Sequence, residues 1–257
     1  MIPFLAAFFV LGAPALALPT TTTTPSADGC TRDLLRFHTE QYINSQIRGD
    51  PSALLAIASP DLVYNEDGVS RSPKTGVTAL SAPLRIDHNR SSLDTTQCAT
   101  YTELIVSDPA NPRVIGTQLR FDPTGQTLVK VESLVSQPGD WAFNATQTLS
   151  YASSEDGKWT TIPEAERDTR AVIQAAADAY LNLFNNPSEV VPWGTPCNVG
   201  VPSGVPITNR RYVIDETLGT VDALVQFATR PDSHEFRVEG GKIKFVHTLT
   251  IMRNVTL

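Results

Sequence analysis

Apolar residues recur with a helical period in two segments, one near the start of the chain and one past its middle. The period predicts amphipathic helices over about residues 31–48 and 164–185. In the first helix, the side expected to face a core carries Leu34, Leu35, His38, Tyr42 and Ile43. In the second helix, the corresponding side carries Val172, Ala176, Ala179, Tyr180 and Leu183.

These two helices open a pattern that occurs twice. "RDLLRFHTEQYIN" (32–44) and "RAVIQAAADAYLN" (170–182) align without a gap. "GQTLVKVESLVS" (125–136) aligns in the same way with "GGKIKFVHTLTI" (240–251), and in both a glycine turn leads into an apolar strand. The chain is therefore predicted to contain two copies of one unit.

We expect each copy to lay a long helix against a curved antiparallel sheet, which is an α+β arrangement. Another strand precedes each aligned strand, at 113–121 and 220–227. In the second copy the Pro/Gly-rich segment 191–209 replaces the turn and the first hairpin. The predicted fold is two cone-like halves, residues 30–150 and 151–257, in which the concave face of the sheet encloses a cavity.

Two segments precede the first half. Residues 1–17 are typical of a secretory signal peptide, with an apolar run, a break at Pro14 and a small-residue cleavage site at 15–17, but with no Lys or Arg before the run. The alternative is an uncleaved membrane anchor, which the short run and its prolines disfavour. Residues 18–29 form a Thr/Pro-rich linker too polar to pack.

Glycosylation sequons and cysteines agree with export. The sequons are Asn89-Arg-Ser, Asn144-Ala-Thr and Asn254-Val-Thr. The three cysteines are Cys30, Cys98 and Cys197, an odd number that leaves one unpaired or paired with another chain. Cys30 and Cys98 could bridge to each other, but the sequence leaves the pairing open. We expect a secreted glycoprotein.

Composition and motifs narrow the function. With 41% hydrophobic and 18% charged residues, the 257-residue chain has the composition of an ordinary globular protein. Its net charge of −7 and its lack of a Lys/Arg cluster argue against a nucleic-acid partner. No metal-ligand spacing, phosphate-binding loop or nucleophile motif is present, so we expect no metal and no cofactor. The oligomeric state stays open.

The segment "YINSQIRGDPSALLAIASPDLVYNEDG" (42–68) resembles the start of the nuclear-transport-factor-2-like (NTF2-like, SnoaL-like) cone fold. Longer segments, among them "IPEAERDTRAVIQAAADAYLNLF" and "NVGVPSGVPITNRRYVID", resemble a group of secreted fungal proteins. The resemblance extends to epoxide-opening hydrolases of aurovertin- or citreoviridin-type polyketide clusters. It implies an apolar, oxygenated small molecule as substrate.

Epoxide opening needs a carboxylate that activates water and a proton donor for the epoxide oxygen. One carboxyl group should be raised in pKa while another stays ionised. The catalytic candidates are Tyr64, Glu66, Asp87, His88 and Glu132. The candidates for substrate binding are Trp193, Arg211 and His247, the last at the repeat position of Glu132.

Each candidate also has a structural alternative. Tyr64 could pack on the first helix, Asp87 and His88 could lie in a solvated loop, and Glu132 could lie on an exposed face with Lys130. Trp193 could anchor an irregular loop.

Strand alternation places Tyr64 and Glu66 on one face, ahead of a turn at Asp67-Gly68. We expect these two side chains to face Asp87 and Glu132 across the cavity. In a catalytic site Asp87 or Glu132 would be the base, and Tyr64 or His88 the donor.

Three functions fit this sequence. The first is a cofactor-independent hydrolase or cyclase that acts on a fungal polyketide. The second is a non-catalytic secreted protein whose cavity holds an apolar ligand. The third is an interaction protein of the fungal surface with a filled core. A pocket lined by at least two carboxyl groups would favour the enzyme.

Overall fold

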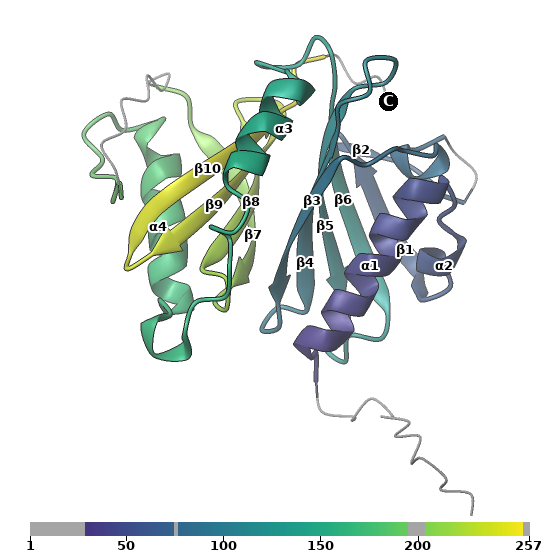
Figure 1. Cartoon of the computed structure of the whole chain (residues 1–257), viewed down its shortest axis with the longest axis horizontal. Helices are drawn as coiled ribbons and strands as arrows, with labels where there is room; N and C mark the ends of the chain where they lie inside the picture. Colours follow the sequence, from purple (N-terminus) through teal and green to yellow (C-terminus); the bar gives the residue numbers. More distant parts are fainter. Residues whose placement is uncertain (1–28, 75–76, 195–203, 254–257) are drawn as a thin grey trace, which may run out of the picture.

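The computed structural model describes residues 29–74, 77–194 and 204–253. The predicted signal peptide, all but the last residue of the linker, Cys197 and Asn254 lie outside these residues. The described chain forms four layers, helix–sheet–sheet–helix, with the two sheets face to face in the middle (Figure 1). The predicted α+β class, with two halves that each lay a long helix against a sheet, is confirmed.

The first half contains the two helices α1 and α2 and a six-stranded sheet. The helices are α1 (Arg32–Arg48) and α2 (Ser52–Leu55), and a 3₁₀ turn, η1 (Ala79–Ser81), follows the second strand. The strands are β1 (Ala58–Glu66), β2 (Val69–Ser70), β3 (His88–Asp94), β4 (Ala99–Val106), β5 (Arg113–Phe121) and β6 (Leu128–Ser136).

The strand order of this sheet is β2-β1-β6-β5-β4-β3. One part of the prediction needs correction, because β1 runs parallel to β6 while the other pairs are antiparallel. The reason is that β1 pairs with the last strand of its half and not with β3, the next long strand in sequence.

Local sequence signals fix both ends of α1. The Thr31 side chain caps the helix by accepting a hydrogen bond from the backbone N–H of Leu34 at 3.2 Å. Gly49 ends the helix in the left-handed conformation, and the backbone of Ala82 and Pro83 lies where a side chain would project. "RGD" at 48–50 is thus a helix terminus.

The cysteine pairing that the sequence left open is resolved for two residues. Cys30, just before α1, forms a disulfide with Cys98 in the turn between β3 and β4. The bridge ties the start of the helix to the sheet beneath it.

The second half has one long helix, α4 (Arg170–Leu183), after a short 3₁₀ turn, η2 (Glu164–Glu166). Its strands β7 (Ile207–Asp215), β8 (Thr220–Phe227), β9 (Arg230–Glu239) and β10 (Lys242–Thr250) form an antiparallel sheet in the order β10-β9-β8-β7. The helix is shorter than predicted, because the residues that were expected to form its first turn form η2 instead. Its buried residues are Ile173, Ala176, Ala177, Tyr180 and Leu181, a face turned by about one residue from the expected one.

The repeat extends to the strands with one correction. Since β6 and β10 align, their hairpin partners β5 and β9 are equivalent. The sequence had instead matched β5 with residues 220–227, which form β8. Among the residues of the second half that the structure describes, none form counterparts of α2, β1 and β2, but Trp193 forms an isolated parallel bridge with Ile243. Ile243 aligns with Leu128, which pairs with Ala58 of β1. A single bridge therefore stands where the first half has a whole strand.

The two halves are joined by a pair of equivalent ion pairs. Arg32, at the start of α1, donates to both carboxylate oxygens of Asp215 at the end of β7, at 2.7 and 2.8 Å. Arg170, at the start of α4, donates in the same way to Asp94 at the end of β3, at 2.8 and 2.7 Å. The arginines occupy matching positions of the repeat, so the contact has approximate twofold symmetry.

A third helix, α3 (Ala145–Ser154), was not predicted. It lies across the seam between the two sheets, where Ala145 and Ala152 pack with Ile105 and Val114 of the first sheet and with Leu249 of β10 (Figure 1). The helix begins at Asn144, whose side chain caps it. Within the described residues, no helix is long and apolar enough to cross a membrane.

Candidate functional site

The concave side of the first sheet is a packed core over most of its length. Tyr64 is 2% exposed and belongs to this core with Leu35, Tyr42 and Val131. Buried hydroxyls also bond to one another, as Tyr42 donates to Thr117 Oγ1 at 2.7 Å. The interior of the cone is therefore packed around these described residues, and a cavity lies at its end.

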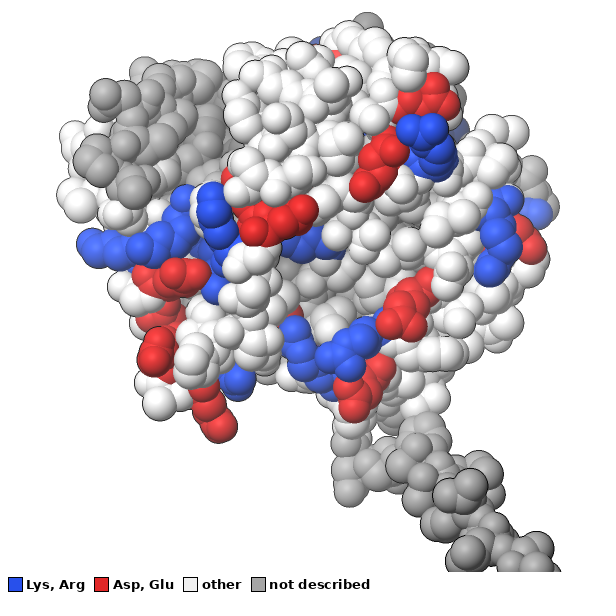
Figure 2. Space-filling view, in the orientation of Figure 1, with Lys and Arg blue, Asp and Glu red and all other residues white. Residues whose placement is uncertain are grey.

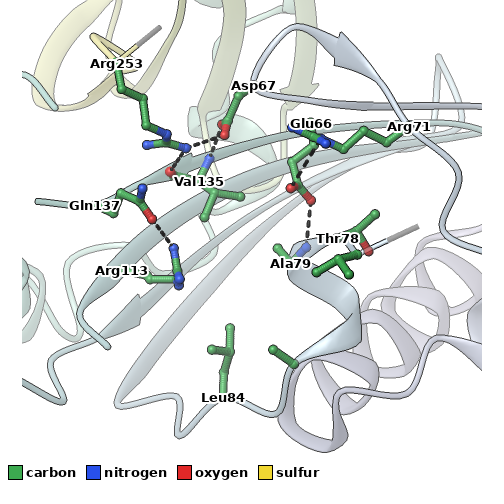
Figure 3. Close-up of a pocket in the computed structure, with 12 residues that line it drawn as sticks. Glu66, Asp67, Arg71, Thr78, Ala79, Leu84, Arg113, Val135, Gln137 and Arg253 are labelled. Carbon is green, nitrogen blue, oxygen red and sulfur yellow. Dashed lines mark hydrogen bonds and ion pairs between the residues drawn. The ribbon is translucent and has the colours of Figure 1, made fainter. Parts of the chain in front are cut away.

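That open end contains a cavity of about 350 Å³ (Figure 3). It lies beyond the ends of β1 and β6, with η1 on one side. Its charged lining residues are Glu66, Asp67, Arg71, Arg113 and Arg253. The walls of this cavity therefore carry charges of both signs.

Glu66 is the carboxylate most directly presented to the cavity. Its Oε2 accepts hydrogen bonds from the Tyr64 hydroxyl at 3.0 Å and from the Ala79 backbone N–H at 2.8 Å. Its Oε1 lies 3.9 Å from Arg71 Nε. Burial and the Glu66 charge raise the pKa of Tyr64, so the phenol stays protonated and donates. Oε2 of Glu66 is thus held by two hydrogen bonds, whereas Oε1 has the longer contact with Arg71, and the residue lines the cavity.

Asp67 forms the floor beside it, in the predicted turn with Gly68, where both residues have positive φ. Its Oδ1 accepts from the Val135 N–H at 2.7 Å, and its Oδ2 accepts from Arg253. Burial raises the pKa of Asp67 to about 6, although the Val135 N–H and Arg253 oppose the shift. This carboxyl group can therefore change its protonation state near neutral pH.

Arg253 reaches this pocket from the chain segment after β10, in the second half. Besides Asp67, it donates to Asp140 and, at 2.8 Å, to the Val135 carbonyl. The pocket of the first half is thus completed by the second. Arg253, Arg71 and Arg113 were not among the predicted site residues, because an isolated arginine carries no motif, and only tertiary structure brings these three together.

The structure brings together only part of the predicted site. Tyr64 and Glu66 share a face as expected, but Asp87 and Glu132 do not lie opposite them. Asp87 lies in the loop before β3, where its Oδ2 accepts from the N–H and the hydroxyl of Ser107, both at 2.7 Å. These bonds lower the pKa of Asp87 and give it a role in the loop.

Glu132 points to the other face of the sheet. It pairs with Asn65 of β1, and the side chain of Asn65 lies on the opposite face from those of Tyr64 and Glu66. There it contacts Lys130 Nζ at 2.9 Å and Arg211 Nε at 3.0 Å. Glu132 and Arg211 share a cleft of about 150 Å³ between the halves. The expected arrangement is therefore wrong for Asp87 and Glu132, since the sheet itself separates Glu132 from Glu66.

The remaining candidates lie elsewhere. Trp193 packs against Tyr180 in the second core, with ring centroids 5.7 Å apart, which fits its structural alternative. His88 Nε2 lies 3.1 Å from Asp156 at the seam, outside the pocket. The sequon residues Asn89 and Asn144 are both exposed.

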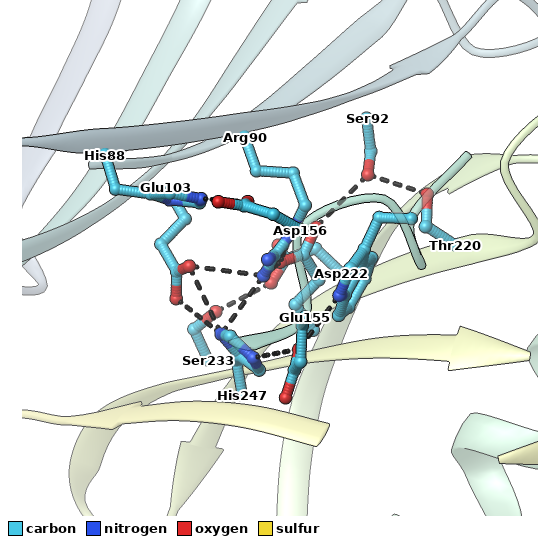
Figure 4. Close-up of polar contacts among 12 residues, drawn as sticks. His88, Arg90, Ser92, Glu103, Glu155, Asp156, Thr220, Asp222, Ser233 and His247 are labelled. Atoms are coloured by element: carbon cyan, nitrogen blue, oxygen red, sulfur yellow. Dashed lines mark hydrogen bonds and ion pairs between the residues drawn. The ribbon is translucent and has the colours of Figure 1, made fainter. Parts of the chain in front are cut away.

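His247 lies in a buried charge network between the sheets (Figure 4). Its Nδ1 is 3.0 Å from Glu103 and its Nε2 is 3.0 Å from Glu155. Arg90 donates to Glu235 at 2.7 Å and stacks 3.6 Å above the Trp159 ring. Glu103, Glu235 and His247 place metal-ligating atoms within 4.8 Å of one another, but Arg90 Nη2 is within 3.2 Å of each and supplies the positive charge.

A pH dependence follows from this network. Burial disfavours the charged form of His247, but Glu103 and Glu155 outweigh it and raise the pKa from 6.5 to about 10. A raised pKa means that His247 stabilises the fold fully below about pH 6.5 and that this contribution is lost as the pH rises through 10. Glu103 behaves oppositely, because its pKa is lowered from 4.5 to about 2 and its contribution is lost as the pH falls through that value.

We therefore expect wild type to exceed His247→Gln in free energy of unfolding at pH 6, and the difference to shrink steadily toward pH 10. Denaturant titrations across this range measure it. Imidazole NMR provides a check, since His247 should remain protonated at pH 8 while His38, whose pKa burial lowers, is neutral. A His247 that titrates near 6.5 would contradict the prediction.

The surface gives no sign of a nucleic-acid site on the face seen in Figure 2. On the described residues of this face, acidic and basic side chains lie next to one another, and no continuous basic stripe crosses it.

Comparison with known proteins gives limited similarity. A family model described as a domain of unknown function (DUF8021) matches residues 166–201 and 198–250. No curated protein sequence matches the chain. Similar solved structures include AclR, a putative hydroxylase from Streptomyces galilaeus (12% identity, TM-score 0.30, 42% of this chain and 92% of that chain). Another is AusH from Aspergillus nidulans, with 13% identity, a TM-score of 0.31, and coverage of 44% of this chain and 90% of that chain. A third is a steroid delta-isomerase from Pseudomonas aeruginosa, with 15% identity, a TM-score of 0.26, and coverage of 49% of this chain and 92% of that chain. Each similarity covers most of the solved chain and less than half of this one.

Proposed function

We propose that the chain is a cofactor-independent hydrolase or cyclase that opens an epoxide in the pocket of the first half. The observation that carries this proposal is Glu66, a carboxylate that lines a cavity of about 350 Å³ and is fixed there by two hydrogen bonds to one of its oxygens. A second carboxyl group, Asp67, lines the same cavity. Two carboxyl groups in one pocket are the feature that distinguishes an acid–base site from a simple apolar cavity.

In this mechanism Glu66 is the general base. It takes a proton from water as the water oxygen forms a bond to one epoxide carbon and the C–O bond of that carbon breaks. Arg71, beside Glu66, donates hydrogen bonds to the oxygen that becomes negative. That oxygen is then protonated by solvent or by Glu66, which restores the carboxylate. Tyr64 is a positioning residue, because its hydroxyl donates to Glu66 and Tyr64 does not itself line the cavity.

The alternative is a non-catalytic small-molecule-binding protein. Its support is that Asp67 is already paired with Arg253, which leaves Glu66 as the one carboxylate of the described lining with an oxygen that accepts no hydrogen bond. A filled core without a cavity, the third function considered from sequence, is less well supported because the pocket is open.

A panel of epoxides separates the two functions. Purified protein should convert at least one of styrene oxide, stilbene oxide and epoxidised unsaturated fatty acids to its diol, at a rate that EDTA and dialysis do not change. Diol formed in H₂¹⁸O should contain one labelled oxygen. Binding of these compounds without any diol would favour the binding protein.

We also propose that the protein passes through the secretory pathway, with an oxygenated polyketide as the substrate class implied by its sequence resemblance. The Cys30–Cys98 disulfide and the exposed sequons Asn89 and Asn144 support export. We expect the secreted protein to lack about 17 residues and to lose mass when treated with a glycosidase. Intact mass spectrometry tests this, and an unshifted mass with Met1 retained would refute it.

A further inference from the structure

The three arginines that line the pocket are unequally paired with carboxylates. Three arginines face two carboxylates there, and the three differ in what they bind. Arg253 is saturated by Asp140, Asp67 and the Val135 carbonyl. It holds the pocket together and has little capacity left for a ligand.

Arg113 is in a different situation. It lies at the start of β5, and within the described part of the chain its one side-chain partner is the neutral amide oxygen of Gln137, at 2.5 Å from Nη1. Its charge is therefore not paired with a carboxylate. A guanidinium has five N–H donors in a planar fork, so most of those of Arg113 remain available.

Arg71 is the second incompletely paired cation. Its contact with Glu66 is 3.9 Å, beyond hydrogen-bond distance, and its side chain is 35% exposed. Figure 3 shows Arg71 with Glu66 on one wall of the pocket, and Arg113 with Gln137 on the other. The cavity thus has a carboxylate and an arginine at one end, and an arginine and an amide at the other.

From this arrangement we propose that Arg113 anchors a carboxylate group of the ligand, and that the substrate of this pocket is therefore an oxygenated carboxylic acid. The bidentate geometry of guanidinium and carboxylate fixes one end of the ligand. The other end then lies toward Glu66 and Arg71. Naming the ligand as the substrate depends on the proposed function, whereas the carboxylate anchor does not.

The test compares small carboxylates with their uncharged amides. Benzoate, hexanoate and 3-phenylpropanoate are titrated into the full mature protein by calorimetry, each beside the matching primary amide. We expect at least one carboxylate to bind, and Arg113→Gln to weaken its binding about 10- to 100-fold, as for the loss of a charge-assisted hydrogen bond. Binding of the amide should change less than threefold.

Two further variants make the result specific. Arg113→Lys keeps the charge but not the fork, so it should bind the carboxylate with intermediate affinity. Arg36→Gln, on the exposed side of α1, removes the same charge elsewhere and should leave binding unchanged. Thermal unfolding of each variant confirms that it is folded.

Two results would overturn the anchor: no carboxylate binding to wild type at 10 mM, or equal carboxylate affinity in Arg113→Gln and Arg36→Gln. Glu66→Gln separates the anchor from the proposed chemistry, because it should retain carboxylate binding while losing turnover. Carboxylate binding that depends on Arg113, with no turnover of any epoxide by wild type, would support the anchor and reject the enzyme.

Discussion

Replacing Asp94 by alanine is expected to lower the free energy of unfolding by about 3–5 kcal/mol, and replacing Asp215 should cost the same. Asp94 is fully buried and accepts two hydrogen bonds from Arg170 and one each from the N–H groups of Thr96, Gln97 and Ile214. Alanine would leave all of these donors without their acceptor.

Asp215 makes the matching set of contacts. It binds Arg32 and accepts from the N–H groups of Leu93, Thr217 and Leu218. Urea unfolding of the two single variants measures the costs. Asp33→Ala is the control, since Asp33 pairs with Arg36 on the surface, and it should change stability by less than about 1 kcal/mol. A cost below about 1 kcal/mol for Asp94→Ala would show that the ion pairs do not hold the halves together.

The second large effect concerns turnover. Glu66→Gln should lower kcat by roughly 10²–10⁴-fold once a substrate is found, because the amide cannot take a proton from water. The side-chain oxygen of glutamine can still accept from Tyr64 and Ala79, so folding should be little affected. Kinetics with the best substrate of the epoxide panel measure this loss.

Two further variants serve as comparisons for Glu66→Gln. Glu40→Gln removes an exposed carboxylate on α1 and should leave kcat unchanged. Tyr64→Phe removes a donor to Glu66, so it should lower kcat by less than Glu66→Gln does. If Glu66→Gln retained wild-type turnover, the base would have to be another group.

Much of the fold follows from the sequence because hydrophobic periodicity marks the long helices and the strands that pack beneath them. The duplication was visible for the same reason, since "Y-[IL]-N" on each helix falls at equivalent buried tyrosines, Tyr42 and Tyr180. Strand pairing was less predictable. The parallel pairing of β1 with β6 depends on contacts between residues more than 60 positions apart, which local patterns do not encode.

The site was predictable only where alternation along one strand decides it. Tyr64 and Glu66 are two residues apart on β1, so their common face followed directly. Glu132 lies on the adjacent strand, where a register offset of one residue reverses the face. Arg253 comes from the end of the other half, and no pattern within its own segment connects it with Asp67.

The two equivalent ion pairs also bear on how this chain can change through evolution. A self-complementary contact of this kind is the arrangement found in homodimers, where one mutation alters both copies of the interface. Here the two copies belong to one polypeptide, so either can change alone. The described residues already show a division of labour: the first half has β1 and its pocket, whereas the second has one bridge at Trp193 and contributes Arg253 to its neighbour's site.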